Sequence, residues 1–172
     1  MSMKNTLKEI HSNKNPDIHT LSPNHSVSDA VDKMKNRSIG ALVILGNDNS
    51  VDGIFSERDL LNRVIGSDLD PKTTKISEVM TPSPICVDTS MTVEEAMRMV
   101  TDKRIRHLPL VSDGKLQGLI SSRDLTAWVA NTQESEIDEL NKKLISAEAK
   151  NKGMIATVIG VCVLLVIYAV VN

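Results

Sequence analysis

Aromatic residues are almost absent from this chain, which has one Trp, one Tyr and one Phe among 172 residues. The formal net charge is −2, and no stripe of Lys and Arg is visible in the sequence. Nucleic acids are bound mainly by clustered cationic side chains and, when single-stranded, by stacking on aromatic rings. We therefore expect no nucleic-acid partner.

Residues that commonly carry chemistry are also scarce. Cys86 and Cys162 are far apart in the sequence, which argues against a structural disulfide or a cysteine metal cluster. None of the four histidines has a metal-site spacing to another. A nucleophile elbow, a P-loop and a dinucleotide glycine fingerprint are all missing. The sequence therefore predicts a binding protein and not an enzyme, with no catalytic residues and no metal site.

What the chain does contain is an internal repeat. Residues 53–60 read GIFSERDL and residues 118–125 read GLISSRDL. The correspondence extends backwards at a constant offset of about 66 residues, because Val27, Ala30, Ile39 and Leu42 align with Val93, Ala96, Ile105 and Leu108. A tandem repeat of this kind implies two equivalent structural units and two equivalent surface sites.

Each repeat is predicted to fold as strand, helix, strand, strand, helix, which places the chain in a mixed α/β (α+β) class. Apolar runs and turn residues predict these elements over 18–21, 26–37, 39–45, 51–55 and 59–65 in the first repeat, and the last helix should end at Gly66. The second repeat should have strands at 85–87, 105–111 and 116–120, a helix capped by Thr92, and a helix at 124–130. Ser26 with Asp29, and Thr92 with Glu95, have the spacing of capping boxes.

The remaining segments are assigned by composition. Residues 1–15 read as a polar amino-terminal segment without a signal peptide, 16–66 as the first repeat, 67–79 as a linker and 80–131 as the second repeat. Residues 132–152 are charged and helix-prone, so they predict a helical stalk. Ile137, Leu140, Leu144 and Ala147 lie at a and d spacing, but over only about two heptads, so a solvated stalk and a dimeric stalk both stay open.

The carboxyl-terminal end is apolar. Residues 154–171 form a run of about 18 residues without a charge, which would be roughly 27 Å long as a helix and close to a bilayer core of about 30 Å. We therefore expect a transmembrane helix over 153–171. The lysines that precede it, Lys142, Lys143, Lys150 and Lys152, predict that the repeats face the cytoplasm. The expected localisation is a single-pass, carboxyl-terminal anchor, with a bacterial inner membrane preferred.

The repeated signature has the chemistry of an anion or sugar site. Each glycine closes a strand, where a missing side chain allows close approach by a ligand or another backbone. Each serine lies at the turn into a helix, where unpaired backbone N–H groups attract anions. Arginine adds a charged fork, and aspartate can accept two hydroxyl groups from a ribose. The alternative is that Ser56 with Asp59, and Ser121 with Asp124, only cap helices.

These residues also resemble a known family. The segments 76–82 (ISEVMTP) and 103–110 (KRIRHLPL), together with the two Gly-x-x-Ser-x-Arg-Asp signatures, are similar to tandem CBS domains, which form a Bateman module. The resemblance covers about residues 16–130. It implies two βαββα units packed about a pseudo-twofold axis, adenosyl ligands in clefts between them, and modules that commonly pair into disc-like dimers.

The resemblance also implies roles for individual residues. Asp59 and Asp124 would hold ribose hydroxyls, and Ser56 and Ser121 would contact phosphate or ribose. The phosphate-binding groups would be Arg106, His107 and Arg123, with Arg58 at the equivalent place in the first repeat. The residues implied to border the adenine are Ile105, Leu108 and Pro109, and those implied to close the cleft are Ile85 and Val87. In the first repeat Gly40-Ala41 replace Arg106-His107 and Val43 replaces Pro109, so we expect the cleft that uses Asp124 to bind better.

The resulting prediction is a membrane-anchored regulatory sensor that binds an adenine nucleotide, AMP, ADP or ATP, between the repeats and signals to a partner. S-adenosylmethionine and NAD are less favoured ligands, and Mg²⁺ is expected only with ATP. The predicted partners are a second copy in a homodimer and a membrane protein. The alternative is a ligand-free CBS scaffold that dimerises or docks onto a transporter, channel or signalling enzyme.

Overall fold

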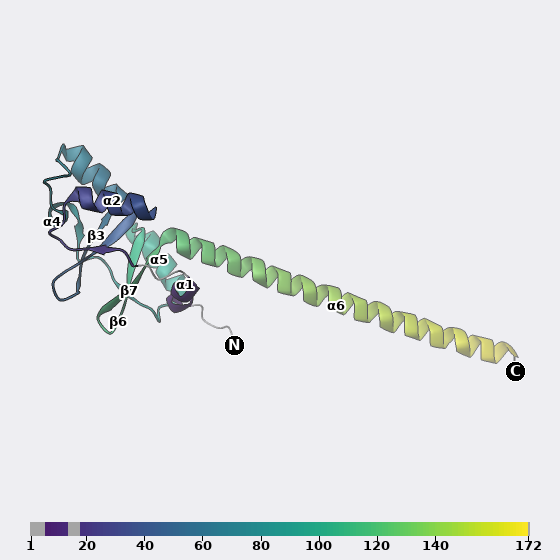
Figure 1. Cartoon of the computed structure of the whole chain (residues 1–172). Helices are drawn as coiled ribbons and strands as arrows, with labels where there is room; N and C mark the ends of the chain where they lie inside the picture. Colours follow the sequence, from purple (N-terminus) through teal and green to yellow (C-terminus); the bar gives the residue numbers. More distant parts are fainter. Residues whose placement is uncertain (1–5, 14–17, 172) are drawn as a thin grey trace. The chain divides into compact units, whose positions relative to one another are not determined.

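The computed structural model describes residues 6–13 and 18–171, with the side chains of the last helix described as far as Lys152. The chain divides into two compact units, Met1–Ala127 and Trp128–Asn172. The first unit contains both repeats with their two β-sheets, and the second consists of the greater part of one long helix (Figure 1).

The first repeat forms a four-stranded sheet in the order β1-β2-β3-β4. Strand β1 runs parallel to β2, whereas β2 with β3 and β3 with β4 are antiparallel. The elements are β1 (Thr20–Leu21), α2 (Val27–Arg37), β2 (Ala41–Leu45), β3 (Val51–Ser56), α3 (Glu57–Asp59), the π-helical turn η1 (Leu60–Val64), the 3₁₀ turn η2 (Ile65–Ser67), α4 (Ile76–Val79) and β4 (Thr81–Pro82).

The second repeat forms a three-stranded sheet in the order β5-β6-β7, with β5 parallel to β6 and β6 antiparallel to β7. Its elements are β5 (Val87–Asp88), α5 (Val93–Lys103), β6 (His107–Ser112), β7 (Lys115–Ser121) and α6 (Ser122–Val171). The two repeats therefore follow the same order of strand, helix, strand, strand and helix. The predicted mixed α/β architecture with a repeated unit is confirmed.

Local sequence explains why α2 and α5 form at equivalent places. Ser26 Oγ accepts a hydrogen bond from the Asp29 N–H at 3.1 Å, and the Asp29 carboxylate accepts one from the Ser26 N–H at 2.9 Å. Thr92 and Glu95 repeat this capping box at the start of α5, with distances of 3.2 and 3.0 Å. Both boxes satisfy N–H groups that have no partner within the helix, so the predicted helix starts are confirmed.

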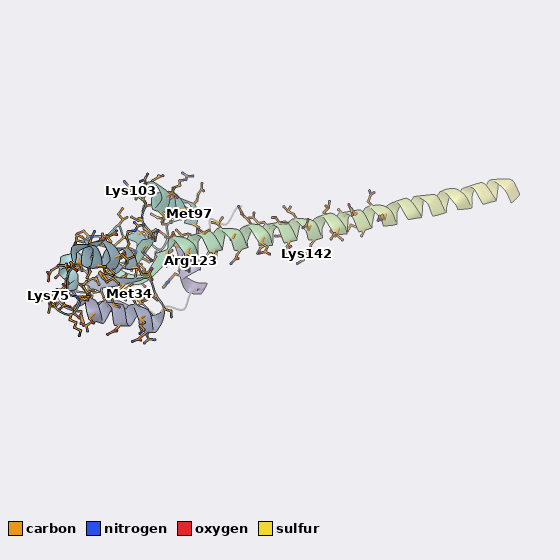
Figure 2. The ribbon with its side chains drawn as sticks, turned by 90° about the horizontal axis from the view of Figure 1, so that it is seen from above. Met34, Lys75, Met97, Lys103, Arg123 and Lys142 are labelled. Atoms are coloured by element: carbon orange, nitrogen blue, oxygen red, sulfur yellow. The ribbon has the colours of Figure 1, made fainter. Side chains whose placement is uncertain are left out.

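The core of each repeat lies between its helices and one face of its sheet. In the first repeat the buried cluster contains Val27, Ala30, Met34, Leu42, Ile44, Phe55, Val64, Ile76 and Val79. In the second repeat the buried apolar side chains include Val93, Ala96, Val100, Leu108, Leu110, Ile120 and Leu125. Figure 2 shows the side chains of this unit around the ribbon, with Met34 on α2 and Met97 on α5 among those labelled.

A short amino-terminal helix, α1 (Leu7–Asn13), packs against the second repeat although it precedes the first. The side chain of Leu7 is fully buried, and its N–H donates to the carbonyl oxygen of Met91 at 2.9 Å. Lys8 N–H donates to the carbonyl oxygen of Thr89, also at 2.9 Å. The sequence interpretation of 1–15 as a polar segment missed this helix, because Leu7 and Ile10 are its only two buried apolar residues.

The signature glycines allow close approach by two segments that are distant in the sequence, β4 and α1. A Cβ on Gly53 of β3 would lie 3.0 Å from Met80 Cγ and 3.2 Å from the carbonyl oxygen of Thr81 in β4. A Cβ on Gly118 of β7 would lie 2.8 Å from His11 Nδ1 of α1. Another part of the same chain thus approaches each strand closely at its glycine, with backbone of β4 at Gly53 and a side chain of α1 at Gly118.

The helix after the first signature differs from its prediction. It continues beyond Gly66 to Ser67 through a π-helical and a 3₁₀ turn, and ends on Asp68, whose φ of 57° is left-handed. The predicted end at Gly66 is therefore wrong. Aspartate adopts the left-handed conformation more readily than most side chains, because its short polar group can hydrogen-bond locally.

The predicted membrane span requires a correction. Over the part of the chain that the structure describes, no helix is both long enough and apolar enough to cross a bilayer. This finding contradicts the transmembrane helix expected over 153–171 and the localisation that depended on it. The apolar run is not a separate element but the end of α6, which starts at Ser122 and whose described side chains beyond Ala130 are mostly exposed and include many charged groups. The side chains of the run itself lie outside the described residues.

Candidate ligand clefts between the repeats

Two clefts lie between the repeats, and each contains one of the two signatures. The larger, here called the Asp124 cleft, has a volume of about 1090 Å³ and contains Ser121, Arg123 and Asp124. The smaller, the Asp59 cleft, has a volume of about 330 Å³ and contains Ser56, Arg58 and Asp59. Volumes of this order hold small organic ligands.

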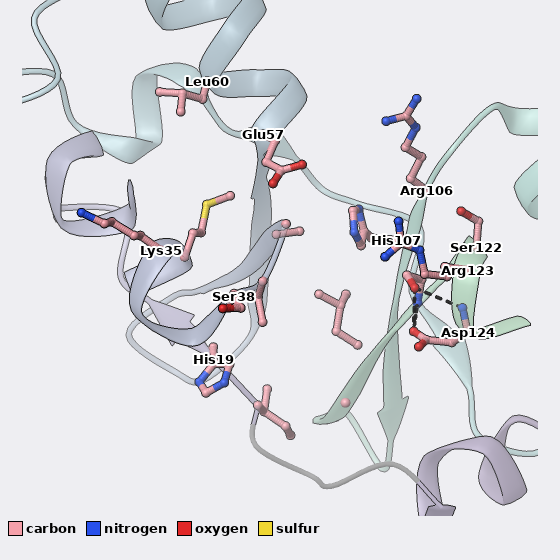
Figure 3. A pocket seen from close by; sticks show the side chains of 18 of the residues that line it. His19, Lys35, Ser38, Glu57, Leu60, Arg106, His107, Ser122, Arg123 and Asp124 are labelled. Atoms are coloured by element: carbon pink, nitrogen blue, oxygen red, sulfur yellow. Dashed lines mark hydrogen bonds between the residues drawn. The ribbon is translucent and has the colours of Figure 1, made fainter. Parts of the chain in front are cut away.

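The Asp124 cleft combines the second signature with the first repeat (Figure 3). Ile18 and His19, which precede β1, line it together with Ser38, Ile39, Gly40 and Ala41 at the start of β2. Figure 3 shows His19, Lys35, Ser38 and Leu60 on one side of the cavity and Ser122, Arg123 and Asp124 on the other. Most of the charged or titratable side chains in its lining are basic or imidazole groups, namely His11, His19, Lys35, Arg106, His107 and Arg123, against the acidic Glu57 and Asp124.

The Asp59 cleft combines the first signature with residues of the second repeat. The first signature lies opposite Pro84 and Ile85, which precede β5, and opposite Arg104, Ile105, Arg106 and His107, which lead into β6. Each signature is thus completed by the opposite repeat. Ile105, expected to border the adenine, and Ile85, expected to close the cleft, both line the cleft of Asp59 and not the cleft of Asp124 that the sequence favoured.

Both signature aspartates form capping boxes. The Asp124 carboxylate accepts hydrogen bonds from the N–H and the Oγ–H of Ser121, each at 2.7 Å. The Asp59 carboxylate accepts the equivalent bonds from Ser56, at 2.9 and 2.6 Å. The capping alternative raised by the sequence is therefore real in both repeats. A ligand hydroxyl would have to share each carboxylate with its serine, which is possible because a carboxylate offers about four acceptor positions.

Asp59 has further contacts that reach the segment between the repeats. Its Oδ1 accepts a hydrogen bond from Thr81 Oγ at 3.0 Å, and Arg63 Nη1 lies 3.5 Å from the same oxygen. Arg63 also donates to the carbonyl oxygens of Val79, at 3.1 Å, and of Met80. The Asp59 side chain is 9% exposed, so this network holds an acidic group in a largely buried position.

Four residues line both clefts at the place where the repeats meet: Gly40, Glu57, Arg106 and His107. Gly40 and Arg106 occupy equivalent positions, because the Gly40 carbonyl accepts from the Glu57 N–H at 3.1 Å and the Arg106 carbonyl accepts from the Ser122 N–H at 2.8 Å. The first repeat thus has Glu57 beside Gly40, whereas the second repeat has Ser122 beside Arg106 at the equivalent positions. A Cβ on Gly40 would lie 3.3 Å from the Glu57 carboxylate.

Three of the predicted site residues line neither cleft. Val87, Leu108 and Pro109 were expected to border or close the ligand site, but they are buried in the second sheet. Leu108 and Pro109 are buried because they belong to β6, the central strand of that sheet, and Leu108 is fully buried in its core. The first residue of β6, His107, is half-buried and is the residue of this strand that lines the clefts.

The sequence interpretation also missed cleft residues, of which Glu57 is the most important. It occupies a variable position of the signature and differs in charge from its equivalent, Ser122. That difference was visible in the alignment of the two repeats. Lys35 and His19 carry no comparable signal, because only the fold brings α2 and the segment before β1 beside the second signature. Within the described ranges, no three His, Cys, Asp or Glu side chains gather as a metal site.

Comparison with known proteins agrees with this architecture. The profile of the CBS domain matches residues 7–66 and 76–131. The chain is 35% identical over 120 residues to the CBS domain-containing protein CBSX3, mitochondrial, of Arabidopsis thaliana. That match covers 67% of this chain and 58% of the relative, so this chain spans less than two thirds of the length of the Arabidopsis protein.

Solved structures show the same fold. The CBS-domain structure NE2398 superposes with a TM-score of 0.70 at 35% identity, covering 73% of this chain and 98% of NE2398. A hexameric CBS-CP12 protein from bloom-forming cyanobacteria superposes with a TM-score of 0.66 at 28% identity, covering 72% of this chain and 67% of the other. CBS-domain proteins therefore include oligomers. With both repeats matched by the family profile and the pair reproduced in solved structures, this chain belongs to the CBS-domain family and carries the domain in tandem.

Proposed function

We propose that the chain is a regulatory module that binds an adenine nucleotide in the clefts between its two CBS domains. The observation that supports this proposal is the crosswise construction of the clefts. In each one, a serine–aspartate signature from one repeat faces an apolar strand entry from the other, with Arg106 and His107 beside both. Such a site offers acceptors for a ribose, an apolar wall for a base and cations for phosphate.

The Asp124 cleft is the preferred site. Its volume of about 1090 Å³ leaves room for a whole nucleotide, and Ile18 and Ile39 provide an apolar wall. Lys35, Arg106 and Arg123 supply positive charge, and Glu57 and Asp124 are the acidic groups of the lining. An adenine nucleotide with its phosphates toward Arg106 and Arg123 would match this charge distribution.

Signalling would follow from the position of the clefts. A ligand that touches both repeats binds more tightly to one relative arrangement of the repeats than to another, and it shifts the population toward that arrangement. In this proposal the module has no catalytic role. Nucleotide turnover by the full chain, followed by chromatography of AMP, ADP and ATP, tests that part, and hydrolysis above the uncatalysed rate would contradict it.

The binding test is calorimetry on the full chain with AMP, ADP and ATP, with and without Mg²⁺. We compare Asp124→Asn and Asp59→Asn with Asp29→Asn. Asp29 is a matched control, because it makes the same capping box with Ser26 and lines neither cleft. A hydrogen bond to a charged group contributes about 1.5–3 kcal/mol, so loss of the ribose-binding carboxylate should weaken binding roughly tenfold to a hundredfold.

We expect Asp124→Asn to show this loss and Asp29→Asn to bind like the unmodified protein. A larger loss in Asp59→Asn than in Asp124→Asn would move the site to the smaller cleft. The proposal is rejected if none of the three nucleotides binds, or if the Asp59 and Asp124 variants both keep full affinity.

The capping boxes favour a second candidate function, a ligand-free interaction scaffold. In both repeats the signature aspartate already stabilises a helix start, which alone would account for the repeated signature. A thermal-melting screen separates the two functions, because a ligand at about 100 times its dissociation constant stabilises a protein by roughly 2.7 kcal/mol. No shift with an adenine nucleotide, S-adenosylmethionine or NAD would support the scaffold, whose binding partner would be a second copy or another protein.

A further inference from the structure

The second unit contains a row of exposed apolar side chains along α6. Ile137, Leu140 and Leu144 are 58%, 64% and 61% exposed. With Ala147 and Asn151 they follow the a and d positions of a heptad repeat, so they lie on one face of the helix. This unit comprises α6 alone from Trp128 onwards, so its described part has no second element of its own to cover that face.

A long helix whose apolar face is uncovered has little to stabilise it when it stands alone. Most helical stability in proteins comes from packing of an apolar face and not from intrinsic propensity. Burial of apolar surface contributes roughly 25 cal/mol per Å², and this face offers two Leu and one Ile for burial. Figure 2 shows the side chains of the stalk, including Lys142, projecting from the ribbon of α6.

We propose that a second copy of this chain packs on this face, and that the two α6 helices form a parallel two-stranded coiled coil over residues 137–151. Ile at a and Leu at d, as at Ile137 and Leu140, is the combination that favours two parallel strands. Asn151 falls at an a position, where a polar Asn fixes the register and limits the assembly to a dimer. An a side chain meets its own copy only when the helices run parallel and in register.

The charges that flank the face fit this partner. Lys143 occupies a g position and Glu148 the following e position, and in a parallel dimer each g residue faces the next e residue of the partner. The dimer would therefore contain two attractive Lys143–Glu148 pairs. Within its own helix Lys143 Nζ lies 2.7 Å from Glu139 Oε1, but this pair is about two-thirds exposed and contributes little, so it leaves Lys143 able to turn toward the partner.

The test uses disulfide cross-linking of the full chain, with Cys86→Ser and Cys162→Ser removing the native thiols. Ile137→Cys and Leu140→Cys place a thiol at a and d positions. Lys142→Cys is the matched control, because it lies at an f position on the opposite side of the same helix turn. All three sites are exposed in one chain, so the substitutions leave the first unit unchanged.

We expect Ile137→Cys and Leu140→Cys each to cross-link at least tenfold faster than Lys142→Cys under mild oxidation. Antiparallel helices cannot bring both a and d thiols to their own copies, so a link at only one position overturns the parallel arrangement. Equal rates at all three positions overturn the coiled coil, even if the chain is oligomeric through its first unit.

Exchanging the charges of Lys143 and Glu148 provides a second test, which again measures the rate of cross-linking. In the Leu140→Cys background, Lys143→Glu alone and Glu148→Lys alone should each slow cross-linking by roughly threefold to tenfold, because they place like charges at g and e. The double exchange should restore the original rate. Failure of restoration would show that these charges do not meet across the interface, and the proposal would fall.

Discussion

Substitution of Gly53 by alanine tests how the signature glycine works. The new Cβ would lie 3.0 Å from Met80 Cγ, still closer to Met80 Sδ, and 3.2 Å from the carbonyl oxygen of Thr81. The Met80 side chain can rotate, but the Thr81 carbonyl belongs to β4, which is paired with β3 through Gly53↔Pro82 and Ile54↔Thr81. Relief of the contact therefore requires displacement of β4, and overpacking of this kind costs about 1–3 kcal/mol.

The expected result is a lower melting temperature. For a unit of this size a loss of 1 kcal/mol lowers Tm by roughly 3–5 °C, so a cost of about 1–3 kcal/mol should lower the Tm of Gly53→Ala by about 3–15 °C. Differential scanning calorimetry is the suitable assay, because circular dichroism would be dominated by the long helix α6.

Gly118→Ala is the matched comparison, because Gly118 is the equivalent residue of the second repeat. Its Cβ would meet only the imidazole of His11, at 2.8 Å, and that ring can turn away. We expect a cost below about 1 kcal/mol. An unchanged Tm for Gly53→Ala, or a larger loss for Gly118→Ala, would refute the argument that close approach of β4 requires the glycine.

Three further predictions concern charge and titration. Glu57→Ser introduces the residue that the second repeat has at the equivalent position, Ser122. It removes a negative charge beside both clefts, so the affinity for ATP should rise about fivefold and the affinity for adenosine should hardly change. Equal gains in affinity for the two ligands, measured by calorimetry, would contradict this prediction. Burial raises the pKa of the Cys86 thiol, so in a Cys162→Ser background iodoacetamide at pH 8 should alkylate it more slowly than a small free thiol, and an equal rate would be inconsistent. Hydrogen bonds from the Ser26 side chain and backbone lower the pKa of Asp29 in the folded protein. The stability that the ionised Asp29 adds to the folded protein is therefore complete above the unfolded carboxyl pKa of about 3.9, and it is lost as the pH falls through the lower folded pKa. Urea midpoints measured between pH 7 and pH 2 should therefore fall less steeply below pH 4 in Asp29→Asn than in the unmodified protein.

The sequence predicted those parts of the fold that depend on local interactions. Ser26 and Thr92 marked the starts of α2 and α5 because a capping box lies within four residues. Strands β2, β3, β6 and β7 could be predicted from apolar runs and turn residues. In contrast, α1 and β4 are stable only through contacts with distant segments, so their short sequences carried no sufficient signal.

The signature residues of the candidate site could be predicted from the sequence, but the residues that face them across the clefts could not. Ser56, Asp59, Ser121 and Asp124 could be identified because the signature is repeated. Their partners could not, because each signature faces the opposite repeat, and no pattern within one repeat indicates this exchange. The burial of Leu108 was equally hard to predict, since it follows from the position of β6 at the centre of its sheet.

The positions of α1 and β4 have a consequence for any attempt to divide the molecule. The helix α1, at the start of the first CBS-domain match, is held by the second repeat, and β4, near the start of the second match, belongs to the sheet of the first repeat. A cut at the apparent boundary between the domains would strip β4 from one half and leave α1 attached to the wrong half. The smallest piece that can be expected to fold alone is therefore the interlocked pair, and isolated halves should be poorly stable whatever ligand is supplied.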